Sequence, residues 1–138
     1  GNVYGLDKTI SPGKNVLGYM IGLLKQNKDI TLYDGGLFLK DYMYVEDICK
    51  AIKLILDRGE LNEIYNVAAG SSMNFREILE RAKSITDSKS NLIDVSMPEN
   101  QKYIQIKNMT LNVDKLNSLG FSCDMKFERG LQILCDVV

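Results

Sequence analysis

Apolar residues recur at two different spacings in the first third of the chain, and each spacing predicts a type of element. Between Val16 and Leu24 they return every three or four positions, which predicts an amphipathic helix over residues 15–27. Residues 30–33 form a short β-type run, followed by the turn signal Asp34-Gly35-Gly36. Residues 37–45 are patterned as a second extended run. This part of the chain is therefore expected to be helix, strand, turn and strand.

A second helix is predicted directly after the extended run. Glu46 and Asp47 stand at its start, where acidic side chains are favoured by unpaired N–H groups and by the helix dipole. We therefore interpret the two acids as structural, not as an acid–base pair. Apolar residues from Ile48 to Leu56 then recur at helical spacing, and residues 63–67 are predicted to form the next strand.

The second half of the chain opens with a capping signal. Asn74 and Glu77 have the spacing of a capping box, with Asn74 as the N-cap. Residues 101–113 show no clear period. The elements predicted here are a helix from the capping box to about Thr86, a strand over 91–97, and helices over 114–119 and 128–138.

Composition narrows the classes of function. The chain has 138 residues, enough for one domain with a modest core, and its 45% hydrophobic and 25% charged residues are ordinary for a globular protein. Lys plus Arg number 17 against 18 for Asp plus Glu, a net charge of −1, so no basic footprint indicates nucleic acid or a membrane surface as partner. The three cysteines are widely spaced, which favours reduced thiols in a cytoplasmic protein. The absence of His excludes His-based metal sites and the usual nucleophile–His pairs.

Several segments match, in unbroken order, motifs of one enzyme family. Residues 40–51, KDYMYVEDICKA, closely resemble the R-D-Y-V-Y-V-E-D-x-x-x-A segment of the extended short-chain dehydrogenases, the NAD-dependent nucleotide-sugar epimerases and dehydratases. The other matches are residues 1–5 with the family's N-x-Y-G strand end, residues 30–36 with its I-x-I-Y-G-D-G segment, residues 63–67 with its E-x-Y-N-V strand, and residues 114–121 with 128–131 with its D-x-x-K-x-x-x-L-G-W and L-x-x-G-L pair. No single match is specific, but the ordered series is.

The resemblance implies an α/β fold, the C-terminal portion of a Rossmann-type extended short-chain dehydrogenase. We expect a small mixed α/β lobe plus edge strands of the larger sheet, the latter at residues 2–4 and 63–67. Residues 1–138 would be a single substrate-binding C-terminal domain. No G-x-x-G-x-x-G loop joins a strand to a helix here. The N-terminal dinucleotide-binding domain is therefore expected to be absent from this chain, and NAD to be a cofactor of the full-length protein that this chain alone does not bind.

The resemblance also implies site residues. Those implied to bind a nucleoside-diphosphate sugar are Asn2, Asn15, Val16, Thr31, Leu32, Tyr33, Lys40, Lys102 and Lys107, while Tyr4 is implied to lie near the nicotinamide of the cofactor. Lys40 replaces the family's usual Arg, so it offers a point charge in place of a bidentate fork, and the alternative for it is a solvated surface lysine. Asn15 can be a plain N-cap or can open a helix whose N-terminus holds the diphosphate. Lys102 and Lys107 are alternatives for one basic residue.

No catalytic residue is predicted. The family's catalytic Tyr and Lys lie on a helix as Y-x-x-x-K. The two matches here, Tyr4 with Lys8 and Tyr103 with Lys107, fall in a strand end and a strand-like segment, so we interpret both as accidental. The function implied is the nucleotide-sugar-binding portion of an NAD-dependent sugar epimerase or dehydratase, inactive by itself. The alternative is a non-catalytic module that binds a nucleotide sugar or a partner.

Self-association is also expected. If residues 63–67 belong to the edge of a larger sheet, that edge is bare in this chain, and the apolar Ile52, Ile55 and Leu56 are uncovered beside it. Bare edges and contiguous apolar patches recruit partners. We therefore predict a homodimer.

Overall fold

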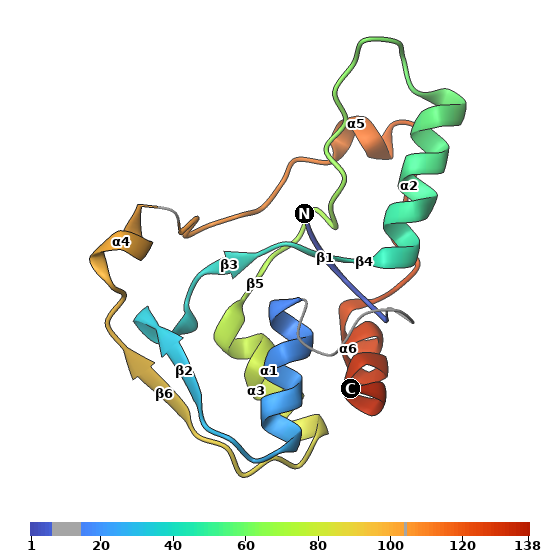
Figure 1. Cartoon of the computed structure of the whole chain (residues 1–138). Coiled ribbons are helices and arrows are strands. Elements are labelled where there is room, and N and C mark those ends of the chain that lie inside the picture. The colour runs from blue at the N-terminus through green and yellow to red at the C-terminus, as the bar shows by residue number, and fades with distance from the viewer. Residues whose placement is uncertain (7–14, 104) are drawn as a thin grey trace.

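The structure is a computed structural model that describes residues 1–6, 15–103 and 105–138. It is a mixed α/β fold in which helices pack against short strand pairs (Figure 1). Its elements are β1 (Asn2–Tyr4), α1 (Val16–Lys25), β2 (Ile30–Tyr33), the 3-10 turn η1 (Asp34–Gly36), β3 (Leu39–Lys40), β4 (Tyr42–Tyr44), α2 (Val45–Arg58), β5 (Met73–Asn74), α3 (Phe75–Ile85), β6 (Leu92–Val95), α4 (Glu99–Lys102), α5 (Asp114–Asn117) and α6 (Phe127–Val137).

Within the described residues the strands form three separate pairs. β1 lies parallel to β4, with Val3 opposite Met43, and β2 lies parallel to β6, with Leu32 opposite Asp94. β3 and β5 are antiparallel. Only Asp41 separates β3 from β4. This stretch of backbone therefore connects the β3–β5 pair directly to the β1–β4 pair.

Side-chain caps fix the first residues of helices α1 and α3. The Asn15 side chain accepts a hydrogen bond from the Gly18 N–H at 2.6 Å, and the Asn74 side chain accepts one from the Glu77 N–H at 2.9 Å. Both bonds satisfy amides that lack a partner within the helix. The predicted helix over 15–27 and the N-cap role of Asn74 are therefore confirmed.

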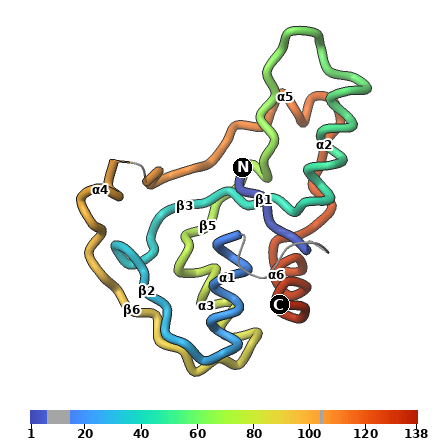
Figure 2. The backbone as a smooth tube through the Cα atoms, in the orientation of Figure 1, coloured from blue at the N-terminus to red at the C-terminus, as the bar shows by residue number. Residues whose placement is uncertain are grey.

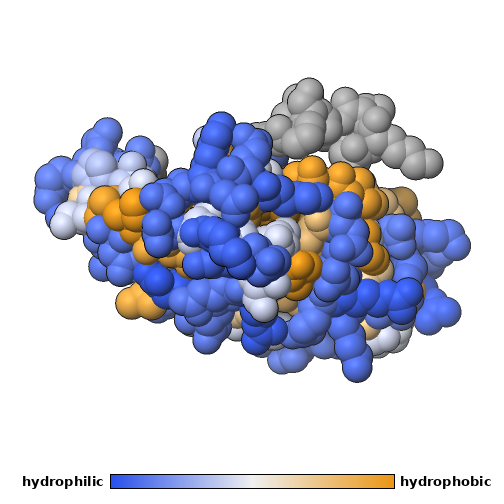
Figure 3. All heavy atoms as spheres, turned by 90° about the horizontal axis from the view of Figure 1, so that it is seen from below, coloured by the Kyte–Doolittle hydropathy of each residue, from blue (hydrophilic) through white to orange (hydrophobic). Residues whose placement is uncertain are grey.

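The main core lies between α1, α3 and α6. Its largest fully buried side chains include Leu17, Ile21, Leu24, Ile78, Leu79, Leu131 and Leu134. Seen from below, the surface over these helices is mostly polar, with apolar atoms showing only in patches (Figure 3). A smaller buried cluster of Met43, Ala51 and Leu116 packs α2 against β4 and α5.

Tyr4 connects β1 to this core. Its ring, 2% exposed, meets the rings of Tyr44 and Phe127, each with centroids 5.3 Å away. Its hydroxyl lies 3.4 Å from the Phe127 carbonyl oxygen. α6 approaches so closely that a Cβ atom at Gly130 would collide with the Tyr4 hydroxyl, so only glycine fits there.

Three sequence predictions need correction. Residues 63–67 form no strand; one Gly1 N–H group bonds to the Val67 carbonyl at 2.7 Å, but Asn66 and Tyr65 make side-chain hydrogen bonds to nearby backbone in place of a ladder. The run over 37–45 is divided at Asp41 into β3 and β4, because its halves pair with different strands. Ile55, predicted to be uncovered, packs partly buried against the cluster of Met43, Ala51 and Leu116.

Other expected elements are present, with slightly different bounds. The strand over 91–97 is β6, and the helices over 114–119 and 128–138 are α5 and α6. The segment without a clear period contains the end of α4 and then an irregular strand-like stretch that runs back past β3 toward α5 (Figure 2). That stretch is held to β3 by the Leu39 N–H bonded to Lys107 O at 2.9 Å and the Met109 N–H bonded to Leu39 O at 3.1 Å. No helix in the described part of the chain has the length and apolar character needed to cross a membrane.

Candidate functional site

A cavity of about 330 Å³ opens between α1, β2 and the start of α3, and we name it the β2 cavity. It gathers six of the residues predicted from sequence: Asn2, Val16, Thr31, Leu32, Tyr33 and Lys40. The other residues that line it are Met20, Gly36, Phe38, Tyr42, Phe75, Met97 and Gln105. The six residues come from β1, α1, β2 and β3, so elements distant in sequence line one cavity.

The alternation of β2 places one face of the strand toward the core and the other toward solvent. Ile30 and Leu32 are buried, whereas Thr31 and Tyr33 are exposed. Tyr33, Phe38 and Phe75 each contribute an aromatic ring to the lining of the cavity. Aromatic rings suit the flat face of a base or another apolar ring.

Lys40 supplies a positive charge to the cavity. Its ammonium donates to the Ile106 carbonyl oxygen at 3.2 Å, and it forms no ion pair with any described carboxylate. Partial burial lowers the pKa of Lys40 below its usual value, because the charged form loses hydration. A partly desolvated cation that has no carboxylate partner among the described residues is suited to attract an anion.

Asn2 contributes a hydrogen-bond donor that has no partner. Its side-chain nitrogen is the one buried side-chain polar atom among the described residues that lacks a hydrogen bond. Buried donors are almost always satisfied, so an orphan donor on a cavity wall points to a group that arrives from outside. Asn2 and Lys40 therefore mark the polar side of the β2 cavity.

The other predicted site residues lie elsewhere. Asn15 caps α1 directly before Val16 of the cavity, and Lys102 forms an ion pair with Glu99 at 2.5 Å on α4. Lys107 contributes its backbone carbonyl to the bond with β3, and Tyr4 lies in the aromatic core. Neither the two lysines nor Tyr4 lines the β2 cavity. Their contacts with substrate or cofactor stay predictions.

Of the two Y-x-x-x-K matches, the structure describes both residues of only one, Tyr103 with Lys107. Lys8 lies outside the described residues, so that match has no described geometry. Tyr103 follows the end of α4 in a turn, and Lys107 lies in the stretch beside β3. No group of His, Cys, Asp and Glu within the described ranges has a metal-binding arrangement.

Two buried acids bind backbone N–H groups of segments distant in sequence: Asp41, between β3 and β4, and Asp47, in α2. The sequence analysis did not single out Asp41. Asp41, 0% exposed, accepts hydrogen bonds from the N–H groups of Ala69 at 2.9 Å, Gly70 at 3.1 Å and Leu111 at 3.4 Å. Asp47 accepts a hydrogen bond from the Met125 N–H at 2.9 Å and one from the Lys50 ammonium of its own helix at 3.5 Å, so it has a structural role. One feature of the sequence could have indicated its role: Asp41 is the one acid inside the apolar, β-type part of the run, and a buried carboxylate needs hydrogen-bond donors.

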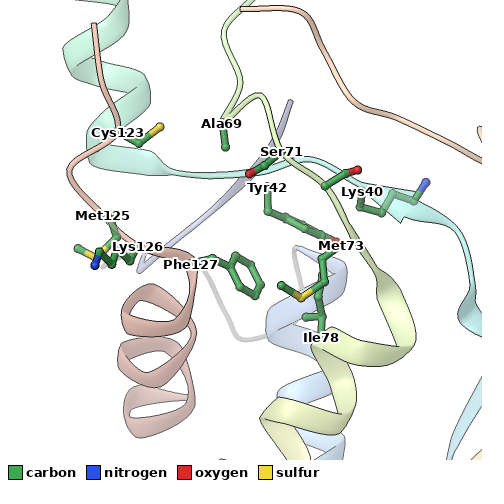
Figure 4. Close-up of a pocket in the computed structure, with 11 residues that line it drawn as sticks. Lys40, Tyr42, Ala69, Ser71, Met73, Ile78, Cys123, Met125, Lys126 and Phe127 are labelled. Atoms are coloured by element: carbon green, nitrogen blue, oxygen red, sulfur yellow. The ribbon is translucent and has the colours of Figure 1, made fainter.

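A second cavity, of about 240 Å³, lies on the other side of Tyr42, and we name it the α6 cavity (Figure 4). Lys40 and Tyr42 line both cavities, so together they form the wall between them. The Lys40 and Lys126 ammonium groups point away from the centre of the α6 cavity, while Met73 and Phe127 face inward (Figure 4). Burial, with nearby acids, raises the pKa of the Cys123 thiol, which disfavours a nucleophilic thiolate there.

The sequence matches a model of the NAD dependent epimerase/dehydratase family over residues 1–68. It is 27% identical over 139 residues to the dTDP-D-glucose 4,6-dehydratase of Mus musculus, an alignment that covers 95% of this chain and 37% of the mouse protein. The chain thus spans between about a fifth and somewhat more than a third of the length of the curated relatives that it matches.

Solved structures show the same fold. A UDP-glucose 4-epimerase of Thermotoga maritima, solved with UDP-glucose, superimposes with a TM-score of 0.84 at 21% identity, covering 98% of this chain and 42% of that one. A dTDP-glucose 4,6-dehydratase of Bacillus anthracis, solved with NAD, gives a TM-score of 0.82 at 23% identity and covers 98% of this chain and 41% of that one.

Proposed function

The chain belongs to the NAD-dependent epimerase/dehydratase family, and from that premise we propose that its β2 cavity binds the nucleoside diphosphate of a nucleotide sugar. The observation that carries the proposal is the presence, in the lining of one cavity, of three aromatic residues, a partly desolvated ammonium and an orphan amide donor. A nucleoside diphosphate has the complementary parts, a flat base beside a doubly charged phosphate chain.

Different lining residues would bind different parts of the ligand. Thr31, Leu32, Tyr33 and Phe75 would border the base and ribose. Lys40 and the Asn2 side chain would meet the diphosphate, since charge-assisted hydrogen bonds to phosphate are the stronger kind. Val16, in the first turn of the ten-residue α1, brings that helix N-terminus to the same side, where its dipole favours an anion.

Lys40 in place of the family's usual Arg changes how the phosphate is held. A guanidinium can bind two phosphate oxygens in a fixed plane, whereas an ammonium acts as a point charge. The Lys40 ammonium is held by one carbonyl, that of Ile106. We propose that the diphosphate replaces this carbonyl as the main partner of Lys40.

We further propose that the polypeptide acts as an NAD-dependent sugar epimerase or dehydratase, with this region as its substrate-binding portion. NAD supplies hydride chemistry when it is bound. The described residues do not fit it well: Tyr4, the residue expected near the nicotinamide, is buried beneath β4 and α6, and the sequence has no glycine-rich pyrophosphate loop. We therefore assign no catalytic step to this chain's residues, and we place the NAD site outside them.

Calorimetric titration with UDP tests the proposal. We expect wild type to bind, and Lys40→Ala to lose about 10- to 150-fold in affinity, which corresponds to about 1.5–3 kcal/mol for a hydrogen bond to a charged group. Lys40→Arg should bind at least as well as wild type, because it restores the fork. The matched control is Lys53→Ala, which removes an exposed lysine of α2 whose ion pair among the described residues is with Asp57, at 3.8 Å.

The same titration has outcomes that contradict the proposal. If wild type binds neither UDP nor dTDP, the β2 cavity is not a nucleoside-diphosphate site. If Lys40→Ala binds as tightly as Lys53→Ala, the site stands but Lys40 is a surface lysine. NAD under the same conditions is expected to give no binding heat, and a saturable NAD signal would contradict the placement of the cofactor outside these residues.

A further inference from the structure

The turn after β2 shapes one wall of the β2 cavity. The turn is η1, and its last residue, Gly36, lines the cavity together with Tyr33 at the end of β2. Gly35 and Gly36 have φ of 71° and 67°, the left-handed region that glycine adopts without strain. A Cβ atom on Gly36 would lie 3.3 Å from the Arg76 backbone nitrogen, so the turn is packed directly against the start of α3.

Arg76 binds this turn through its side chain. Its Nε donates to the Gly35 carbonyl oxygen at 2.8 Å, and a terminal nitrogen bonds to the carboxylate of Asp94. The remaining terminal nitrogen lies 3.6 Å from Glu80 one turn further along α3. The Arg76 side chain is 24% exposed, while its two acidic partners are more than half exposed. The guanidinium thus joins a helix, a turn and a strand at one point.

Among the described residues β2 has one strand partner, β6, in which Asp94 lies opposite Leu32. A two-stranded pair needs further packing in water, and Ile30 and Leu32 supply it by packing into the main core. The turn after β2 lies beyond these two buried residues and is held by the Arg76 side chain. The turn has one further tie to the chain after β6: the Met97 N–H donates to the Asp34 carboxylate at 3.0 Å. Because Tyr33 and Met97 both line the cavity, a shift of the turn would move both of them.

We propose that Arg76 is a positioning residue that fixes the base-facing wall of the β2 cavity without touching the ligand. This inference rests on the proposed nucleoside-diphosphate site and names a residue that sets its shape. Arg76 does not itself line the cavity, and it acts through Gly35 and Asp94. It differs from Lys40, which would act on the diphosphate directly.

Helix α3 offers a matched control. Arg81 lies on the same helix, and its guanidinium donates to Glu128 of α6 at 2.8 Å, on a side that does not line the β2 cavity. Replacing Arg76 or Arg81 by Met removes the same charge from the same helix and keeps a long side chain. A loss that follows from helix destabilisation or from lost net charge would appear in both variants.

The test measures UDP and UMP affinity by calorimetry, below the unfolding temperature of each variant. We expect Arg76→Met to lose about tenfold in affinity, equivalent to about 1.4 kcal/mol, for both ligands alike. Arg76→Lys should recover part of the loss, since an ammonium can keep one of the two bonds. Lys40→Ala, by contrast, should weaken UDP more than UMP, because UMP has one phosphate fewer.

Each alternative outcome decides against a specific claim. If Arg76→Met binds both ligands as tightly as Arg81→Met, or if both variants lose equally, Arg76 is not a positioning residue. If Arg76→Met does not fold, Asp94→Asn tests the same link from its exposed end, and unchanged affinity there overturns the inference. If wild type binds neither ligand, the proposed function falls, and the inference falls with it. That result is distinguishable from a failure at Arg76 alone.

Discussion

Removing the Asp41 carboxylate should be among the most damaging single changes to this fold. Three backbone N–H groups, those of Ala69, Gly70 and Leu111, converge on its two oxygens at 2.9 to 3.4 Å, and the side chain is 0% exposed. The Asp41 backbone carbonyl also accepts from the Asn2 N–H at 2.6 Å. One residue therefore joins β1, the loop before β5 and the stretch before α5.

The expected magnitude follows from these bonds. A buried donor left unsatisfied costs about 1–3 kcal/mol, and breaking a buried charged network costs about 3–5 kcal/mol in total. We therefore expect Asp41→Ala to lower the free energy of unfolding by about 4 kcal/mol, a large part of the 5–15 kcal/mol typical of a domain. Asp41→Asn keeps the shape and one acceptor oxygen, so it should cost about half as much.

Urea unfolding followed by circular dichroism measures this. With a slope of about 1.5–2 kcal/mol per molar, a 4 kcal/mol loss lowers the midpoint by about 2–3 M. Asp57→Ala, at an exposed acid that pairs with Lys53 at 3.8 Å, is the control and should change stability by less than about 0.5 kcal/mol. If Asp41→Ala costs no more than that control, the three bonds do not stabilise the fold and the reasoning is wrong.

Two further predictions concern pH and assembly. Burial raises the pKa of Tyr42 to about 12 from the ordinary value of 10.0, and burial also raises the pKa of Tyr4, so the unfolded chain releases these protons at lower pH than the folded one. These two groups should therefore leave the free energy of unfolding unchanged below about pH 10 and lower it between about pH 10 and pH 12. The urea midpoint should decline over that range, and the decline should be smaller in Tyr42→Phe than in wild type. An equal decline in both proteins would contradict this prediction. Leu56, Leu61 and Ile64 are 82%, 92% and 86% exposed, so we expect self-association, which sedimentation at about 100 μM should detect and Leu56→Glu should weaken. A monomeric wild type under those conditions would count against a dimer through this surface.

The sequence was most informative where local chemistry determines structure. The spacing of apolar residues over α1 and α3 and the caps at Asn15 and Asn74 depend on neighbours within a few positions, and the structure agrees with them. Six cavity residues could also be predicted, because the order of motifs indicates a known arrangement. In contrast, the strand predicted over 63–67 is absent, because strand formation depends on a partner that the local pattern does not specify.

Long-range partners explain what sequence reasoning did not find. Asp41 is a charged residue in an extended run, and only the approach of Ala69 and Leu111 explains its burial. Arg76 lies between the two capping-box residues Asn74 and Glu77, and the local pattern assigns it no role because its acceptors on Gly35 and Asp94 are 41 and 18 residues away. Phe75 joins the cavity wall for the same reason: α3 is placed against the turn after β2 by contacts that no local pattern contains.

The enclosure of Tyr4 by α6 sets an order of events during synthesis. Tyr4 and the Phe127 carbonyl that faces its hydroxyl are 123 residues apart. At a translation rate of about 5–20 residues per second, the ribosome needs about 6–25 s to make the chain between them. Throughout that interval the rings of Tyr4 and Tyr44 lack the helix that covers them, and Gly130 cannot yet take its place against the phenol. The aromatic side chains around Tyr4 therefore stay exposed on the nascent chain until α6 has left the ribosomal exit tunnel. Exposed apolar surface of this kind is what chaperones bind.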